Sequence, residues 1–352
     1  MKTTILSRLR PCGLAALIGI ALSSGLAQAQ SFCVYDPLGA QGDYSTLFKD
    51  YQLAAKRWNV TIDIKLYTDD EKLDAAFRAG QCDMASMIGM RARSFNEFTG
   101  TIDAPSAVEN YQEMRTVMNI VASPKMAKYM VSGPYEVTGV IPVGAAYAVV
   151  DDRAINSVEM AAGKKAGIMG WDKPQIMVAE DFHIIPVKTD LTHYGTVFNS
   201  GAADIVVAPM VLYRPLELYK GIGTNGGIIR RPLFNFTMQV VALKDRFPPN
   251  FAQQSREYMN AQVDHALGLI HNNEADVDSH LWIYASRQQV KEWNKACRAT
   301  LDHLTREGYY DKHMLAVLQR VRCTSEPDGI GCDAATTAAP ATTPTPAAGG
   351  NL

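Results

Sequence analysis

Short strand-like segments alternate with helix-like segments along the chain, and this alternation restricts the fold more than any other feature of the sequence. Apolar stretches at residues 31–39, 60–68 and 82–89 are predicted to be strands, while residues 44–58 and 69–80 place apolar side chains at helical spacing. A strand–helix–strand–helix–strand order requires right-handed crossovers and produces a parallel sheet. This part of the chain is therefore predicted to be an α/β lobe.

The same alternation returns in the middle of the chain. Residues 164–170, 183–187 and 202–210 are predicted strands, and residues 173–182 and 191–201 are predicted helices. The phrases FRAGQCDMASMIGM and FNSGAADIVVAPM share an aromatic residue, a glycine, an aspartate and an apolar strand at matching spacing. We therefore expect two α/β lobes of similar design, each with a central, mostly parallel sheet, and a cleft between them.

Two long apolar stretches, at residues 137–150 and 226–245, are predicted to carry the chain from one lobe to the other and back. The region at residues 251–322 is mostly helical in pattern and is expected to pack on the first lobe. The predicted organisation is a signal peptide at residues 1–29, a first lobe at residues 30–140 that the chain rejoins at residues 231–323, a second lobe at residues 141–230, and a tail at residues 324–352.

Both ends of the sequence differ from its body. Basic residues precede an apolar run that ends in Ala-Gln-Ala at residues 27–29, which is the layout of a cleaved secretory signal and predicts export to the periplasm. An uncleaved membrane anchor is the alternative. Removing the signal changes the formal net charge from −2 to about −5, which argues against nucleic acid and anionic membranes as partners. The Thr-, Ala- and Pro-rich tail lacks bulky apolar side chains and is predicted to be disordered.

Cysteine usage agrees with export, because an oxidising compartment allows disulfides. Cys33 and Cys82 each lie near the start of a predicted strand, which suits a disulfide between neighbouring strands of one sheet. Cys297 and Cys323 could pair if the last two helices form a hairpin, and a Cys323–Cys332 disulfide is the competing alternative. No C-x-x-C spacing or nearby histidine pair indicates a metal site, and no cofactor is expected.

The predicted export signal, the two α/β lobes and the phrase DAAFRAGQCDMASM resemble extracytoplasmic solute-binding proteins, and more nearly the binding proteins of tripartite ATP-independent periplasmic (TRAP) transporters. GKKAGIMG and FNSGAADIVVAP take the places of that family's G-x-K-x-R strand and L-x-x-G-x-x-D turn. FCVYDPLGAQGD and GKKAGIMGWDKP resemble still more closely a subgroup described as solute-binding proteins, some of them labelled efflux-pump proteins. The resemblance implies a periplasmic-binding-protein-like fold, a small-molecule solute as ligand and inner-membrane transporter subunits as partners.

The sequence departs from the TRAP family at the residue that binds the substrate. In that family the arginine of G-x-K-x-R pairs with the substrate carboxylate, whereas Ala166 and Gly167 stand here where the arginine would fall. Arg91 and Arg93, two residues apart after a predicted strand, are candidates to replace it, because a guanidinium can donate two hydrogen bonds to a carboxylate. Either arginine could instead pair with an acid of its own lobe.

The remaining candidates lie where predicted strands end or where the chain crosses between lobes, since open parallel sheets bind ligands at the carboxyl ends of their strands. Tyr35 and Asp36 end the first strand, and Gln41 and Gly42 precede a helix N-terminus, although Asp36 could serve only to form a turn. Asp172 could bind the ligand or cap the helix that follows it. The other candidate ligand-binding residues are Tyr147, Trp171 (as a stacking surface), Met210, Tyr213, Arg214 and Asn235.

No catalytic set is evident in the sequence: the histidines are scattered, and there is no G-x-S-x-G elbow and no Gly-rich fingerprint between a strand and a helix. We therefore expect a periplasmic solute-binding protein and not an enzyme. It would capture a small polar, carboxylate-bearing molecule between its lobes and deliver it to an inner-membrane, TRAP-like transporter. An accessory protein of an envelope efflux system and a periplasmic enzyme on the same fold are the alternatives.

Overall fold

The computed structural model describes residues 29–327 and residue 332. The predicted signal peptide and most of the predicted tail lie outside the described residues, so both stay predictions. The strands are β1 (Gln30–Tyr35), β2 (Ile62–Tyr67), β3 (Met84–Ile88), β4 (Val131–Ser132), β5 (Tyr135–Val150), β6 (Lys165–Met169), β7 (Ile185–Thr189), β8 (Ile205–Pro209), β9 (Gly227–Leu243) and β10 (Trp282–Ile283).

Helices follow the predicted strands in the predicted order. They are α1 (Asp43–Ala55), α2 (Asp70–Arg78), α3 (Gly89–Ala92), α4 (Glu97–Gly100), α5 (Tyr111–Ala122), α6 (Val158–Ala161), α7 (Lys173–Asp181), α8 (Tyr194–Asn199), α9 (Leu218–Ile222), α10 (Phe251–Ala261), α11 (Val263–Ala275), α12 (Arg287–Arg306) and α13 (Lys312–Ser325). Helix α2 shows how the local sequence determines where a helix begins and ends. The Asp69 carboxylate accepts hydrogen bonds from the backbone N–H groups of Glu71 and Lys72, and Gly80 leaves the helix at a φ of +70°.

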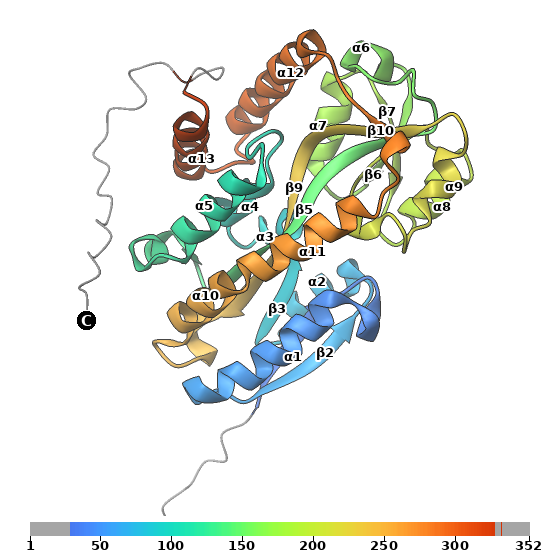
Figure 1. Cartoon of the computed structure of the whole chain (residues 1–352). Helices are drawn as coiled ribbons and strands as arrows, with labels where there is room; N and C mark the ends of the chain where they lie inside the picture. The colour runs from blue at the N-terminus through green and yellow to red at the C-terminus, as the bar shows by residue number, and fades with distance from the viewer. Residues whose placement is uncertain (1–28, 328–331, 333–352) are drawn as a thin grey trace, which may run out of the picture.

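Within the described residues, one sheet of ten strands runs through both lobes in the order β2-β1-β3-β9-β5-β8-β6-β7, with β10 on β9 and β4 on β5. Strands β1–β3 are parallel to one another and form the first lobe, and β6–β8 are parallel and form the second. Strands β5 and β9 pair antiparallel along their length and connect the lobes (Figure 1). Near one end β9 pairs with β3 (Met84↔Ala242), and near the other β5 pairs with β8 (Val150↔Ile205). The two predicted crossings are therefore these strands.

The long strand β5 pairs irregularly with β9 along most of its length. The register shifts between Val137 and Gly139, between Pro142 and Gly144, and twice more between Ala146 and Val149. A Cβ atom at Gly139 would lie 2.5 Å from Met259 Cγ of α10, so only glycine lets this helix pack so closely on the strand. One of these shifts, between Pro142 and Gly144, lies in the region in which the strand leaves one lobe for the other.

The C-terminal helices follow the sequence prediction only in part. Helices α10 and α13 pack with α5, which belongs to the segment predicted for the first lobe, and α10 also crosses β5. Helix α12 instead packs against α6 and α7 of the second lobe. There the rings of Trp293 and Phe182 meet edge to face, with centroids 5.7 Å apart. An amphipathic pattern predicts that α12 is a helix but does not specify which lobe its apolar face covers.

Two disulfides join described cysteines. Cys33 of β1 is bonded to Cys82, which lies just before the neighbouring strand β3, and this prediction is confirmed. Cys323 is bonded to Cys332, so the predicted Cys297–Cys323 pairing is wrong and its competing alternative holds. Cys297 is a buried free thiol. Because α12 packs on α7 while α13 packs on α5, the two helices present their cysteines to different parts of the core.

Candidate functional site

The two lobes touch where the strands β3 and β6 end. Strand β3 runs into α3, which places Arg91 and Arg93 at the end of the first lobe's sheet, and β6 is followed directly by Trp171 and Asp172. Each arginine contacts one of these two second-lobe residues. We call the group of Arg91, Arg93, Trp171 and Asp172 the junction. The rule that ligands bind at the carboxyl ends of parallel strands thus selected residues that the fold does bring together.

Arg93 and Asp172 form an ion pair between the lobes. Arg93 Nη2 donates to Asp172 Oδ1, and the two residues are only 9% and 2% exposed. Asp172 Oδ2 also accepts a hydrogen bond of 3.2 Å from the backbone N–H of Gln175, so the helix-cap interpretation of Asp172 is confirmed, while ligand binding by Asp172 stays a prediction. Burial raises the pKa of Asp172, and the Arg93 guanidinium partly offsets this rise. Burial alone would lower the pKa of Arg93, but the nearby Asp172 carboxylate outweighs burial and the pKa of Arg93 is raised.

Arg91 makes the second contact between the lobes. Its guanidinium carbon lies 3.7 Å from the centroid of the Trp171 ring, a cation–π distance, while Nε donates to Asp70 Oδ2 of its own lobe at 3.1 Å. Burial raises the pKa of Asp70, with Arg91 acting in the opposite direction. The indole Nε1 of Trp171 is buried and has no hydrogen-bond partner among the described residues. The junction therefore offers an unused donor beside two guanidinium groups.

Two further residues, Asp103 and Tyr310, lie beside Arg93 of the junction, and no sequence pattern predicted either of them. Asp103 is fully buried and accepts hydrogen bonds from Thr237 N and Oγ1 at 3.1 and 2.9 Å. Burial raises the pKa of Asp103 to about 8, against the influence of Thr237 and Arg93. The ring of Tyr310 lies 5.5 Å from the Arg93 guanidinium. Asp103 comes from a short 3-10 turn and Tyr310 from the connection of α12 to α13, and no sequence spacing links them to β3.

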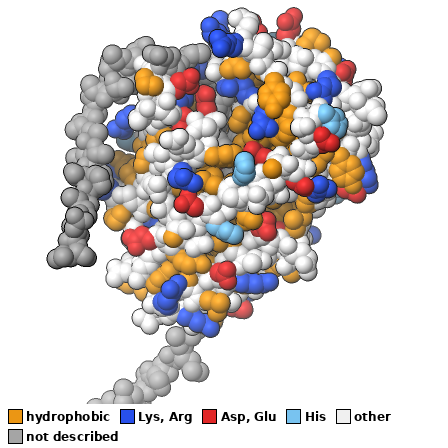
Figure 2. Space-filling model, in the orientation of Figure 1, with side chains coloured by type: hydrophobic (Ala, Val, Ile, Leu, Met, Phe, Trp, Pro, Cys, Tyr) orange, Lys and Arg blue, Asp and Glu red, His pale blue; other side chains and the backbone are white. Residues whose placement is uncertain are grey.

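An open cavity of about 370 Å³ lies against the junction. Its charged lining residues are Arg78, Arg91, Arg93, Lys173, Glu97 and Asp172. Three of the four cations already have a carboxylate partner: Arg93 pairs with Asp172, Arg91 with Asp70 and Arg78 with Asp74, the last two acids lying just outside the lining. On the face of the molecule shown in Figure 2, Lys and Arg side chains are interspersed with Asp and Glu side chains.

The model of the solute-binding protein AdeT 1/2 family matches residues 52–336. The chain belongs to this family. The probable solute-binding protein AdeT1 of Acinetobacter baumannii is 37% identical over 299 residues, which make up 85% of this chain and 98% of that protein. The solute-binding function implied by the resemblance is therefore the function for which the family is named.

Solved structures with the same fold are TRAP periplasmic solute-binding proteins. One from Ralstonia eutropha H16, with bound (S)-2-acetolactate, has a TM-score of 0.69 and 15% identity over 85% of this chain and 99% of that chain. Another from Haemophilus influenzae, with bound L-gulonate, has a TM-score of 0.67 and 14% identity over 83% of this chain and 99% of that chain. At these identities the likeness shows the fold alone, and the predicted two-lobed binding-protein fold is confirmed.

In this member of the AdeT 1/2 family, two small buried residues stand at the place of the TRAP arginine. Ala166 and Gly167 are buried within β6, and a Cβ atom at Gly167 would lie 3.0 Å from Val206 Cγ1. A side chain added at Gly167 would require the Val206 side chain to shift. The junction arginines come from the first lobe instead.

In the turn after β1, the Asp36 carboxylate occupies the space that a bound ligand was expected to take. Asp36 accepts hydrogen bonds from the backbone N–H groups of Leu38 and Ser45, both at 2.9 Å. A Cβ atom at Gly42 would lie 2.0 Å from the carboxylate oxygens of Asp36, so this glycine makes room for Asp36. Asp36 also lines a small apolar cavity of about 30 Å³ together with Tyr35, and Gln41 is exposed beside it.

The five remaining candidates lie away from the junction. Tyr147 donates to Glu274 of α11 at 2.8 Å, and Asn235 donates to the Val108 carbonyl at 2.7 Å. Met210 is buried in the core, Tyr213 packs on Tyr219, and Arg214 forms an exposed ion pair with Asp276. Residues in a crossing strand alternate between faces, and the sequence does not show which face α11 will cover.

The described residues hold no cluster of His, Cys, Asp and Glu that could bind a metal ion. None of their helices is both long enough and apolar enough to cross a membrane.

Proposed function

We propose that the protein is a periplasmic receptor that captures a small carboxylate-bearing solute at the junction and delivers it to an inner-membrane, TRAP-like transporter. Membership of the family supports solute binding. The two solved structures described above have the same fold as this chain and hold the acids acetolactate and gulonate. The particular ligand class, the periplasmic location and the transporter are parts of the proposal.

The single observation that carries the proposal is that both arginines after β3 reach across to the turn after β6. Arg93 contacts Asp172, and Arg91 contacts Trp171, so any molecule between the lobes here meets two guanidinium groups at once. A guanidinium has five N–H donors, and one Nη2 contact to Asp172 leaves donors for a second carboxylate. A bound acid would then bridge the lobes as Asp172 now does.

The other features of the junction fit the same ligand class. The cavity beside it is lined by the two arginines and by Lys173, and the buried Nε1 of Trp171 can donate to a carboxylate or hydroxyl oxygen. The flat indole face could then support the less polar part of the solute. Removing one partner of a buried, hydrogen-bonded charge pair typically costs about 2–5 kcal/mol of binding free energy.

The proposal can be tested by thermal shift and tryptophan fluorescence with acetolactate, L-gulonate and succinate as probes and butylamine as the charge-reversed control. At least one acid should raise Tm saturably and change the emission of Trp171, because the acid would compete for Arg91. Arg93→Ala should weaken that response at least about thirtyfold. Arg115→Ala is the matched control, since Arg115 sits in an ion pair with Asp264 in which both side chains are at least half exposed. Equal affinity in the wild type and Arg93→Ala, or stabilisation by butylamine alone, would overturn the assignment.

A further inference from the structure

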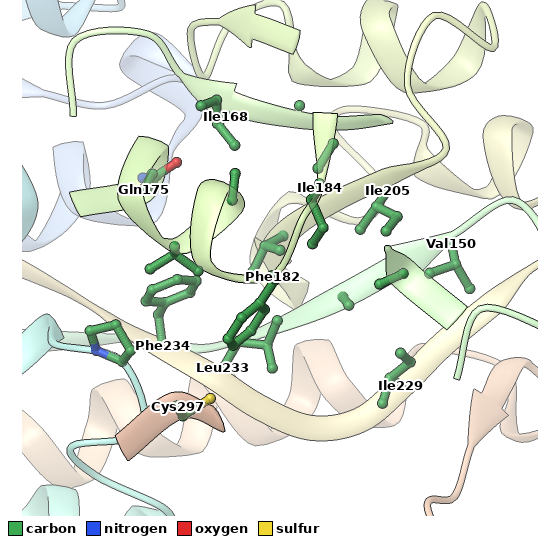
Figure 3. A pocket seen from close by; sticks show the side chains of 18 of the residues that line it. Val150, Ile168, Gln175, Phe182, Ile184, Ile205, Ile229, Leu233, Phe234 and Cys297 are labelled. Atoms are coloured by element: carbon green, nitrogen blue, oxygen red, sulfur yellow. The ribbon is translucent and has the colours of Figure 1, made fainter. Parts of the chain in front are cut away.

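A second cavity, of about 80 Å³, lies mostly within the second lobe and has a different chemistry from the junction. Strands β5, β6, β8 and β9 form its floor, α7 forms one side and α12 closes another. Figure 3 shows Val150, Ile205 and Ile229 on the strands, Phe182 at the end of α7, and Cys297 directed from α12 toward the same space. Three layers of the fold therefore meet around it without filling it.

No residue that lines this cavity carries a charge. The amide of Gln175 is already engaged, because its Oε1 accepts from Met169 N at 3.0 Å and its Nε2 contacts Met90 Sδ at 3.0 Å. Burial raises the pKa of the Cys297 thiol to about 11, so this wall stays uncharged at neutral pH. A carboxylate or an ammonium group placed here would lose its hydration without gaining a counter-charge.

One donor in the wall has no partner. Trp293 lines the cavity and is 9% exposed, and its indole Nε1 is buried without a hydrogen bond among the described residues. Buried polar groups in proteins are nearly always paired, so an orphaned N–H beside an unfilled space marks the place of an acceptor atom. The edge-to-face contact with Phe182 fixes the indole ring in this position.

We propose that this cavity is a second binding site, which takes a small, uncharged and mostly hydrocarbon molecule whose single hydrogen-bond acceptor pairs with Trp293 Nε1–H. Its volume is about half that of an engineered apolar cavity that holds benzene, so a molecule of about four non-hydrogen atoms fits. The lining residues Val178 and Ile184, at α7 and just after it, are only partly buried, as are Ser157, Val207 and Phe234. This site does not depend on the function proposed for the junction.

The chemistry can be tested with three compounds of three carbon atoms each, one neutral, one anionic and one cationic. The indole ¹⁵N–¹H resonance of Trp293, assigned with Trp293→Phe, should shift saturably with 1-propanol and should not respond to propionate or propylammonium. Xenon should shift the same resonance, because it occupies dry apolar cavities of this size. The indole resonance of Trp171 at the junction should stay in place with 1-propanol. An absent response to both 1-propanol and xenon, or an equal response to propionate, overturns the proposal.

Filling the cavity provides an independent test. Ala179 of α7 lines the cavity and is 3% exposed, so Ala179→Leu should abolish the response to 1-propanol while Tm stays equal or rises. Ala54 of α1 is the matched control, because it is also 3% exposed but does not line the cavity. Ala54→Leu should lower Tm, since extra methylene groups in a packed core force neighbours apart. If Ala179→Leu lowers Tm as much as Ala54→Leu, or fails to fold, the space is not available to a ligand and the proposal is wrong.

Discussion

Asp103 is a buried carboxyl group whose protonation should make the stability of the junction depend on pH. Its pKa is raised from 3.8 to about 8 in the folded protein, first by burial, so the folded state holds the proton more tightly than the unfolded state. This contribution to stability is fully present below pH 3.8 and is lost as the pH rises to about 8. A single group of this kind gives a slope of up to about 1.4 kcal/mol per pH unit.

Asp103→Asn removes the titrating proton and keeps an acceptor for Thr237. The free energy of unfolding, measured by urea denaturation between pH 5 and pH 8, should therefore fall less steeply in the variant than in the wild type. Asp172 and Asp70 also have raised pKa values, so the difference between the two proteins isolates Asp103. Parallel pH profiles would show that Asp103 is ionised in the folded protein across this range.

Asp172→Asn tests the ion pair between the lobes. It leaves the Arg93 guanidinium buried without its counter-charge, which should lower the free energy of unfolding by about 3–5 kcal/mol. Asp264→Asn breaks the exposed pair with Arg115 and should cost less than about 1 kcal/mol. On the proposed function, an acid that binds the junction should stabilise Asp172→Asn more than the wild type. A variant as stable as Asp264→Asn would mean that the Arg93–Asp172 contact contributes little.

At the scale of single elements, the turn between β1 and α1 depends on close contact between Gly42 and Asp36. Gly42→Ala should lower the free energy of unfolding by about 1–3 kcal/mol, because a Cβ atom 2.0 Å from the Asp36 carboxylate would break its hydrogen bonds to Leu38 and Ser45. Gly268→Ala is the control, since Gly268 lies within α11 with open space around it and should gain up to about 1 kcal/mol. Chemical denaturation that finds both variants equally stable would contradict this account of the turn.

The disulfide between Cys33 and Cys82 ties β1 to the start of β3. Replacing both cysteines by alanine should lower the free energy of unfolding by about 4 kcal/mol, because the bond closes a loop with a sequence separation of 49 residues. Guanidinium denaturation of the double variant and the wild type measures this loss. The double variant should also be far less sensitive to reductant than the wild type, and equal sensitivity would place the stabilising bond at Cys323–Cys332.

Elements whose pattern is local were predictable from the sequence, and contacts between distant elements were not. The parallel strands and both crossings follow from apolar periodicity, and the rule for strand ends selected Arg91, Arg93 and Trp171. Helix α12 packs on the second lobe, and Cys297 is buried as a result. This packing depends on which surface of the two lobes is left uncovered, and the sequence of α12 does not specify that surface. Tyr147 was predicted to bind the ligand but lies away from the junction, because its hydroxyl donates to Glu274 of α11. This contact is also one between distant elements.

At the scale of the whole molecule, one sheet joins both lobes, and the contacts at the junction hold them together. Strands β5 and β9 form the continuous connection, while Arg93–Asp172 and Arg91–Trp171 link the lobes through side chains. A solute that inserts between these side chains can change the relation of the lobes without breaking the sheet.

The central claim is that a small acid binds at the junction through its two arginines. Native mass spectrometry of the purified protein, incubated with a small-molecule extract of the cells that make it, tests this claim most directly. The wild type should carry an adduct with the mass of an organic acid, and Arg91→Ala/Arg93→Ala should lose it while Arg115→Ala keeps it. Absence of any adduct on the wild type, or an adduct that persists on the double variant, would contradict the claim.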